Sequence, residues 1–289
     1  MKTLAFKQTN NRGHWVGDGF PVRSIFSYND RARELSPFLL LDYAGPATFQ
    51  PTNKRLGVGE HPHRGFETVT IVYSGEVAHR DSSGGGGLIG PGDVQWMTAA
   101  GGVVHEEFHG PAFAKNGGTF EVIQLWVNLP AKDKMSKPGY QAITTDTIPT
   151  ADLPNGAGFA RVIAGRYGDV AGPARTFTSM NVWDVRLNAG ARVELPASEG
   201  HTTAVFVLKG HVRVGGTEIG ESELAGLTRE GANVEVEALD RATVLFLSGE
   251  PIDEPIVGYG PFVMNSQDEI RQAVVDYQTG KMGHLRETA

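Results

Sequence analysis

Five of the nine histidines lie between residues 61 and 109: His61, His63, His79, His105 and His109. Imidazole is the commonest side-chain ligand of metal ions in proteins. The chain contains no cysteine, so a metal ion would have to be bound by histidine, aspartate or glutamate. The clustering therefore predicts a metal site in the first half of the chain.

Two pairs of possible ligands have the spacing of one face of an extended strand. His61 and His63 are two residues apart, and so are His105 and Glu107. Alternate side chains of a strand point to the same side of a sheet. If the two pairs lie on neighbouring strands that face the inside of a barrel, three imidazoles and one carboxylate meet around one divalent ion. Iron, zinc, nickel, copper and manganese all fit such a donor set, so the residues alone do not select the metal.

Three further residues leave alternatives open. Glu67 has the strand parity of the first pair, so it can be a ligand, an acceptor that orients an imidazole, or an ordinary paired carboxylate. His109 lies four residues after His105, but a Gly-Pro sequence follows it and indicates that the strand ends. An isolated buried histidine is more often a hydrogen-bonded core residue than a ligand, so we expect His79 and His109 to lie outside the ligand set.

Composition argues against several classes of protein. The 289 residues carry a formal net charge of −7, which argues against direct binding to nucleic acid through the overall field of the protein. No run of about 18 apolar residues is present to span a membrane. The first residues lack the apolar segment and cleavage site of a secretory signal peptide, so a cytoplasmic location is expected.

Short runs rich in Val, Ile, Phe and Thr alternate with glycine and proline turns, which is typical of an all-β barrel or sandwich. The expected strands are 68–73, 94–98, 120–127, 182–187, 204–208, 234–237 and 243–247. One helix is expected at about residues 266–280, because Ser266 and Glu269 form a capping box and Gly280 follows the last apolar position. We expect this helix to pack across a sheet.

The expected strands form an internal repeat. Residues 68–77 align with residues 203–212, and each segment is a strand that a glycine turn connects to a second strand. Residues 120–130 correspond to residues 243–251 at a smaller offset, which insertions in loops would produce. Two related β-barrels in tandem explain both alignments.

The repeat predicts two domains. We expect an N-terminal metal-binding barrel over residues 1–140 and a C-terminal barrel without a metal site over residues 150–289, with the helix in the C-terminal domain. The boundary is expected between residues 138 and 154, a Pro/Thr/Asp-rich segment with the composition of a linker.

Several motifs resemble those of the pirins, a family with two cupin (jelly-roll) barrels. In the first half they are EHPHRGFETVT at 60–70, GPGDVQWMTA at 90–99 and GVVHEE at 102–107. In the second half they are RVIAG at 161–165, GEPI at 249–252 and YGPFVMN at 259–265. The resemblance implies one iron ion in the N-terminal barrel, held by His61, His63, His105 and Glu107. It thereby favours Glu107 over Glu67 as the fourth ligand.

The second barrel departs from this pattern. In the alignment of the two halves, Pro196 and Ser198 stand where the first two histidines stand in the first barrel. Glu235 and Glu237 fall near the positions of the second ligand pair, and His201 has no imidazole partner. In the first barrel the cupin proline two residues before Gly102 is replaced by Ala100, which we interpret as a loop variation.

The resemblance also implies an activity. Some pirins act as quercetin 2,3-dioxygenases, so the expected reaction is the O₂-dependent opening of a flavonol-like aromatic ring, with Glu107 as the catalytic base that takes the proton of the flavonol 3-hydroxyl. Apolar residues near the motifs, Phe66, Trp96, Met97 and Phe108, can form the walls of such a pocket or belong to the core. Arg64 can bind an anionic group or pair with a carboxylate.

Two other functions stay open at this point. Eukaryotic pirins are regarded as transcriptional cofactors, so the resemblance also fits an iron- or redox-sensing regulator that binds a protein partner. A zinc-dependent isomerase would need only another ion in the same ligand set.

Overall fold

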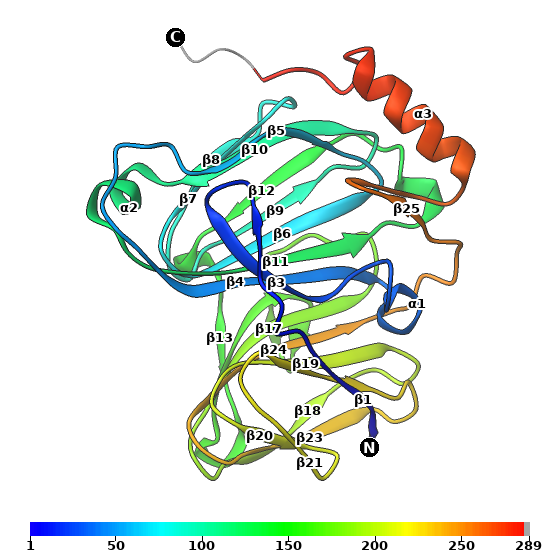
Figure 1. Ribbon diagram of the computed structural model, residues 1–289. Helices are drawn as coiled ribbons and strands as arrows, with labels where there is room; N and C mark the ends of the chain where they lie inside the picture. The colour runs from blue at the N-terminus through cyan, green and yellow to red at the C-terminus, as the bar shows by residue number, and fades with distance from the viewer. Residues whose placement is uncertain (286–289) are drawn as a thin grey trace. The chain divides into compact units, whose positions relative to one another are not determined.

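Antiparallel β-sheets make up most of the structure, a computed structural model that describes residues 1–285 (Figure 1). The chain forms two units, and each is built from segments that are not continuous in sequence. Unit 1 comprises residues 1–11, 34–37 and 146–251. Unit 2 comprises residues 12–33, 38–145 and the chain from 252 onwards.

Unit 2 contains a seven-stranded sheet, a four-stranded sheet and a hairpin. The larger sheet has the order β12-β9-β6-β11-β4-β3-β2, with strands β2 (His14–Val16), β3 (Phe20–Phe26), β4 (Phe38–Phe49), β6 (Phe66–Ser74), β9 (Val94–Thr98), β11 (Gly118–Asn128) and β12 (Gly139–Ile143). The smaller sheet has the order β5-β10-β7-β8, with strands β5 (Gly57–His63), β7 (Val77–Asp81), β8 (Gly86–Ile89) and β10 (Val103–His109). The hairpin consists of β25 (Val257–Tyr259) and β26 (Phe262–Met264).

Unit 1 repeats this architecture. Its seven-stranded sheet has the order β1-β22-β19-β24-β17-β14-β13, with strands β1 (Leu4–Thr9), β13 (Thr150–Asp152), β14 (Gly158–Ala164), β17 (Met180–Leu187), β19 (Thr202–Lys209), β22 (Glu223–Leu227) and β24 (Ala242–Gly249). Its four-stranded sheet has the order β18-β23-β20-β21, with strands β18 (Arg192–Pro196), β20 (Val212–Val214), β21 (Thr217–Ile219) and β23 (Asn233–Ala238). A small hairpin joins β15 (Arg166–Tyr167) to β16 (Val170–Ala171).

The predicted strands and the predicted repeat are confirmed. Each expected strand lies within an observed one: β6, β9 and β11 in unit 2, and β17, β19, β23 and β24 in unit 1. The order β9-β6-β11-β4 in one large sheet corresponds to β22-β19-β24-β17 in the other. Alternating strands place every second side chain on the inner face of a sheet, and in unit 1 these inward side chains form one apolar cluster. The cluster includes Trp183 and Phe246, whose rings are stacked with centroids 4.7 Å apart.

The grouping into units differs from the expected ranges at both ends of the chain. Strand β1 pairs with β22 and so extends the sheet of unit 1, where the ring of Phe6 lies over Gly226, a position that leaves no room for a Cβ atom. The hairpin and the C-terminal helix belong to unit 2. Strand periodicity marks a buried face but does not specify which of two similar sheets an edge strand joins, so the sequence could not decide these assignments.

Helices are few and short. They are α1 (Ala32–Leu35), α2 (Pro111–Asn116), α3 (Gln267–Gln278) and the 3₁₀ segments η1 (Ala131–Asp133), η2 (Thr145–Thr147) and η3 (Pro154–Gly156). The predicted N-cap is present, because the Ser266 side chain accepts a hydrogen bond from the Glu269 amide at the start of α3, while the Glu269 carboxylate accepts one from the Asn265 amide. Within residues 1–285, no helix is long and apolar enough to cross a membrane.

Helix α3 packs on unit 2 through one face. Ile270 and Ala273 are buried in a cluster with Val104 of β10 and Phe262 of β26. The sequence places Tyr277 on the same apolar face, but its side chain is 39% exposed and the adjacent Asp276 is buried instead. A buried charge requires a partner, and Arg64, which follows β5, pairs with this carboxylate.

Candidate metal centre

Pairing of β5 with β10 brings the predicted histidines together. His105 lies directly opposite His61, and His63 lies opposite Val103. The ring centroids of His61 and His105 are 4.2 Å apart, and those of His63 and His105 are 4.8 Å apart. One nitrogen atom from each of the three rings lies within 4.8 Å of the other two, which is close enough for one ion to bind all three.

Glu107 lies next to the three histidines but belongs to a second potential metal-binding group, which overlaps with the first. The β5–β10 pairing is irregular after His105. Strand β10 also pairs along its other edge with β7, where Glu107 is opposite His79. A carboxylate oxygen of Glu107 lies within 4.8 Å of ring nitrogens of His79 and His105. His105 is therefore common to both groups. His79 thus lies beside the cluster, and its place outside the ligand set stays a prediction from the sequence.

Hydrogen bonds fix the orientation of the first two histidines. Nδ1 of His61 is 2.8 Å from the carbonyl oxygen of Gly59, and Nδ1 of His63 is 3.4 Å from that of Pro261. A carbonyl oxygen can only accept, so in both rings Nδ1 carries the proton and Nε2 keeps its lone pair. This arrangement is typical of metal-binding histidines, whose second nitrogen donates to a backbone carbonyl or a carboxylate.

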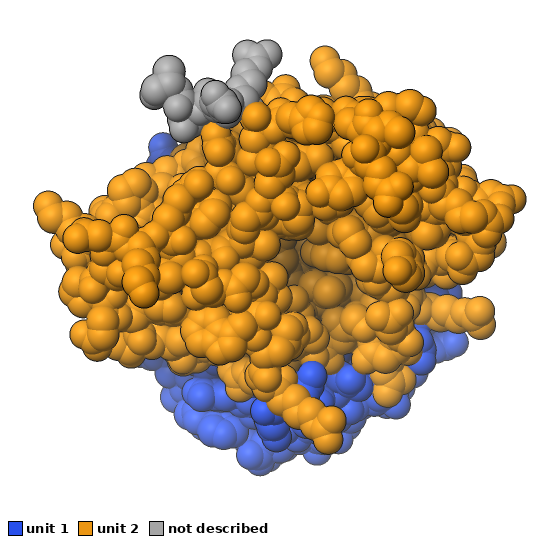
Figure 2. Space-filling model, turned by 45° about the horizontal axis from the view of Figure 1, so that its top comes forward, with its two compact units in different colours: residues 1–11, 34–37, 146–251 blue, residues 12–33, 38–145, 252–289 orange. Residues whose placement is uncertain are grey.

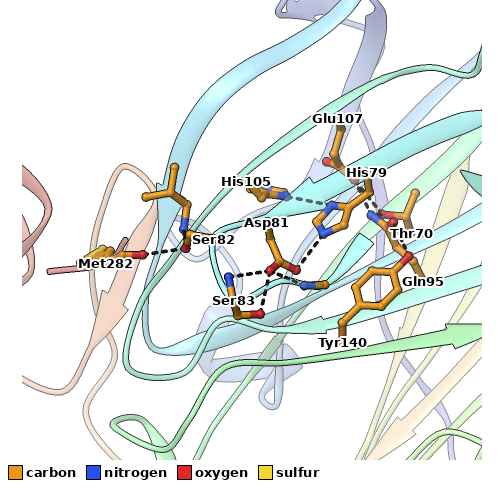
Figure 3. Close-up of polar contacts among 12 residues, drawn as sticks. Thr70, His79, Asp81, Ser82, Ser83, Gln95, His105, Glu107, Tyr140 and Met282 are labelled. Carbon is orange, nitrogen blue, oxygen red and sulfur yellow. Dashed lines mark hydrogen bonds and ion pairs between the residues drawn. The ribbon is translucent and has the colours of Figure 1, made fainter. Parts of the chain in front are cut away.

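A carboxylate acts on His105 through a second imidazole (Figure 3). Nε2 of His79 is 3.2 Å from Oδ2 of Asp81, so this nitrogen donates, and in the neutral ring Nδ1 of His79 is the acceptor. Nδ1 of His105 lies 3.3 Å from that acceptor and therefore carries a proton. Nε2 of His105 is buried and has no hydrogen-bond partner among the described residues. A buried nitrogen lone pair without a partner is costly, and a metal ion would satisfy it.

Burial keeps these imidazoles in the form that binds metals. His63 is 4% exposed and His105 is completely buried. Burial, followed by the charge of His61, holds the pKa of both rings well below the ordinary value of histidine. Both rings are therefore neutral at pH 7, as metal binding requires.

Asp81 is itself held in place. Its Oδ1 accepts hydrogen bonds from the backbone amide and the hydroxyl of Ser83 and from the amide of Gly85, at 2.6–2.9 Å. Burial alone would raise the pKa of Asp81, but the hydrogen bond from His79 and those from the turn outweigh burial and lower the pKa. Asp81 is therefore ionised at neutral pH and can hold the proton on Nε2 of His79.

Glu107 is oriented from the large sheet. Gln95 on β9 donates from Nε2 to Oε1 of Glu107 at 2.5 Å, and the Thr70 hydroxyl on β6 lies 3.3 Å from the same oxygen. Tyr140 on β12 stacks on the ring of His79 with centroids 5.0 Å apart, and its hydroxyl lies 3.4 Å from Oε1 of Gln95 (Figure 3). These contacts tie Glu107 and His79 to the same wall of unit 2.

A cavity of about 360 Å³ adjoins the cluster in unit 2, and Figure 2 shows a hollow in the surface of this unit. His61, His63 and Glu107 lie in its wall. Most of the other lining residues come from β2, β3, β4, β5 and β11, and the rest are residues 27–29, 260 and 261. The apolar ones include Val16, Phe20, Val22, Leu40, Val58, Val122 and Trp126. Concave, largely apolar spaces of this size with a few polar groups are typical of small-molecule sites.

Two other residues considered from the sequence lie elsewhere. Glu67 faces away from Thr70, since the two differ in strand parity, and its carboxyl group accepts a hydrogen bond from the Thr98 hydroxyl at 2.7 Å. Burial raises the pKa of Glu67 to about 7. His109 donates from Nε2 to the carbonyl oxygen of Gly19 at 2.8 Å and packs among phenylalanine rings. Neither residue belongs to a potential metal-binding group within residues 1–285.

The apolar residues and the arginine that the sequence offered as pocket walls or as an anion site make structural contacts instead. Phe66, Trp96 and Met97 are completely buried and do not line the cavity. Phe108 lies under the guanidinium group of Arg55, 3.7 Å from the ring centroid. Arg64 is 4% exposed and pairs with Asp276 of α3 at 2.9 Å, so it binds a carboxylate of this chain.

The corresponding part of unit 1 has different chemistry. Pro196, Ser198 and His201 line a depression of about 620 Å³. Glu237, which aligns near Glu107, accepts a hydrogen bond from Arg213 at 2.7 Å. The potential metal-binding groups found within residues 1–285 all lie in unit 2.

Two cupin domains with a histidine-rich cluster in one of them define a class of bicupin proteins with a candidate metal site. Residues 19–127 match the family described as Pirin, and residues 182–283 match the Pirin C-terminal cupin domain. The chain belongs to the pirin family.

Individual relatives agree with this assignment. The chain is 58% identical to a Pseudomonas aeruginosa protein named "Putative quercetin 2,3-dioxygenase" over 97% of this chain and 98% of that protein. It is 35% identical to human Pirin over 88% of this chain and 85% of the relative. The crystal structure of a quercetin 2,3-dioxygenase from Acinetobacter baumannii is similar, with a TM-score of 0.96 and 53% identity over 99% of this chain and all of that one.

Proposed function

We propose that the protein is a metal-dependent dioxygenase of the quercetin 2,3-dioxygenase type. The observation that carries the proposal is the convergence of three imidazoles, whose Nδ1 atoms are engaged in contacts that leave Nε2 available, next to Glu107 and beside a largely apolar cavity. His61, His63, His105 and Glu107 would hold one divalent ion. Their donor set of imidazole and carboxylate suits iron(II), and also nickel, copper, manganese or zinc.

The bound metal would supply a site where an aromatic hydroxyl and O₂ react. The residues of the chain prepare the substrate for this chemistry. Glu107 lies in the cavity wall, and Gln95 fixes one of its oxygens, so the carboxylate can accept the proton of a flavonol hydroxyl. Phe20, Trp126 and the other apolar walls would hold a planar ring system and exclude water.

The overall reaction needs no external reductant. The flavonol supplies the electrons, both atoms of O₂ enter the opened product, and one ring carbon leaves as carbon monoxide. O₂ uptake should therefore equal flavonol consumption. Location in the cytoplasm stays a prediction from the sequence.

Oxygen uptake by protein that has been loaded anaerobically with iron(II) tests the proposal. We expect quercetin to be consumed with an equal amount of O₂ and to lose its absorbance. His61→Ala should abolish turnover together with metal binding, whereas Glu107→Gln should slow turnover by at least about 100-fold, because it removes the base. His201→Ala in unit 1 is the matched control, and it should retain the wild-type rate.

Absence of quercetin-dependent O₂ uptake with iron, nickel, copper or manganese would overturn the proposal. A change in affinity for a protein partner between the iron(II) and iron(III) forms, without turnover, would instead support a redox-sensing regulator.

A further inference from the structure

Five polar residues form a row across the inner face of the large sheet of unit 2. Ser24, Asp42, Gln124, Thr70 and Gln95 are directly paired across β3, β4, β11, β6 and β9. Side chains that are directly opposite in neighbouring strands lie on the same face of a sheet. Ser24, Asp42 and Gln124 line the cavity beside the candidate metal centre.

Hydrogen bonds account for one end of this row. Gln95 donates to the Thr70 hydroxyl at 3.1 Å, and the Thr70 hydroxyl lies 2.7 Å from Oε1 of Gln124. Gln95 also donates to Glu107, so this end of the row supports the candidate metal centre.

The other end of the row is incomplete. The Ser24 hydroxyl hydrogen-bonds the carboxyl group of Asp42, but Oδ1 of Asp42 is buried without any hydrogen-bond partner among the described residues. A buried carboxylate oxygen without a donor costs about 1–3 kcal/mol or more, so such atoms usually have a use. Because Asp42 lies in the cavity wall, a ligand in the cavity can supply the missing donor.

Gln124 supplies the complementary group. Its Oε1 is taken by Thr70, which leaves the amide hydrogens on Nε2 for a ligand. An acceptor on Asp42 and a donor on Gln124 therefore lie side by side. A hydroxyl group matches this pair, since it donates one hydrogen bond and accepts another.

We propose that Asp42 and Gln124 form a second recognition site in the cavity, which binds a phenolic hydroxyl at the end of the substrate remote from the metal centre. The inference rests on the proposed function and specifies its substrate class: planar polyphenols that carry a hydroxyl beyond the group at the metal. Asp42 lies two strands away from Thr70, which corresponds to about 10 Å. A molecule with two or three aromatic rings would span this distance, and a single phenol would not.

Binding under nitrogen, where turnover cannot occur, tests the inference on the metal-loaded protein. The probes are 3-hydroxyflavone and its 4′-hydroxy and 7-hydroxy derivatives, which differ by one hydroxyl, and the dissociation constant is measured by absorbance or fluorescence titration. For the wild type we expect one derivative to bind at least about tenfold more tightly than 3-hydroxyflavone. Asp42→Leu should abolish this preference and leave the affinity for 3-hydroxyflavone within a factor of about two.

Two variants and one control make the result specific. Asp42→Asn keeps an oxygen acceptor and should retain part of the preference, and Gln124→Leu should reduce it. Asp268→Asn, at an exposed position on α3, should behave as the wild type. Thermal unfolding and metal content verify that each variant is folded and loaded.

Persistence of the hydroxyl preference in Asp42→Leu would overturn the inference, and so would a wild type that binds all three flavonols equally or none of them. The proposed function fails separately. Hydroxyl-dependent binding without O₂ uptake in air would refute the dioxygenase and leave the recognition site, whereas normal O₂ uptake with an unchanged preference in the Asp42 variants would refute only the recognition site.

Discussion

Nδ1 of His79 lies 3.3 Å from Nδ1 of His105, and this contact determines which nitrogen of His105 faces the other two histidines. Asp81 accepts the proton on Nε2 of His79, so Nδ1 of the neutral His79 ring accepts from His105. The result is a chain of carboxylate, imidazole and imidazole that ends at the unpartnered Nε2 of His105. Replacing a residue that fixes the tautomer of a metal-binding histidine typically lowers metal affinity by about 10–100-fold.

Replacement of His79 should therefore weaken metal binding without removing a ligand of the proposed set. We expect His79→Leu to lower metal affinity by about 10–100-fold, measured by competition with a chelator of known affinity. His79→Gln retains an oxygen that can accept from His105, so it should recover part of the loss. His109→Leu, which loses another buried histidine, should lower the melting temperature and leave metal affinity unchanged. A His79→Leu protein with wild-type affinity would contradict the role of this contact.

Gln95 should act on Glu107 in a similar way. Gln95→Leu removes the donor 2.5 Å from Oε1 of Glu107 and leaves that carboxylate free to rotate. We expect a decrease in kcat for quercetin of about tenfold or more, measured at saturating metal so that loading does not limit the rate. Tyr140→Phe is the matched control, because it removes only a hydroxyl 3.4 Å from Gln95 and should change kcat less than threefold. Equal rates for Gln95→Leu and the wild type would argue against a positioning role.

Glu67 should affect stability and not metal binding. Burial raises the pKa of this carboxyl from 4.5 to about 7, so the folded state holds its proton more strongly than the unfolded chain does. The contribution of Glu67 to the stability of the folded protein is complete below about pH 4.5 and decreases as the pH rises through 7. Glu67→Gln, which is always neutral, should therefore be more stable than the wild type above pH 7, by up to about 3 kcal/mol.

Denaturant unfolding at pH 5 and pH 9, together with metal analysis, measures both effects of Glu67→Gln. A loss of metal in this variant would show that Glu67 is a ligand after all, and an unchanged difference in stability between the two pH values would show that Glu67 is already ionised in the folded protein.

The buried pair of Arg64 and Asp276 should connect α3 to the loop that follows His63. Asp276→Asn leaves the buried guanidinium group of Arg64 without a counter-charge, and we expect a loss of about 3 kcal/mol of unfolding free energy. Asp268→Asn on the same helix forms an exposed pair only and should cost less than about 1 kcal/mol. A small effect of Asp276→Asn would mean that water or another residue compensates Arg64.

The Asp276 carboxylate should also make the stability of the protein depend on pH. Hydrogen bonds from Lys281, Gln272 and Arg64 lower its pKa from 3.8 to about 2. Because the pKa of Asp276 is lower in the folded than in the unfolded protein, its ionised carboxylate stabilises the fold above about pH 3.8. This stabilisation is lost as the pH falls toward 2. The melting temperature of the wild type should therefore decrease more steeply between pH 4 and pH 2 than that of Asp276→Asn, and parallel curves would contradict this.

Much of the fold could be predicted from the sequence. Alternating β-branched residues and glycine turns identified the central strands of both units, and the capping box at Ser266 identified α3. These features depend on neighbours within a few residues, so they are visible in a single sequence. The association of β1 with unit 1 depends on a partner more than 200 residues away and was not predictable.

The candidate site shows the same division. The sequence determined that His61 and His63 share one face of a strand and that His105 and Glu107 share another, because strand periodicity is local. Only the tertiary structure decided that His79 stands behind His105 and that Glu67 faces away from the cluster. It also decided that Asp42, one of whose oxygens has no hydrogen-bond partner among the described residues, lines the cavity. Side-chain types and their spacing specify what a strand can present, whereas register and packing between strands distant in sequence specify what each side chain contacts.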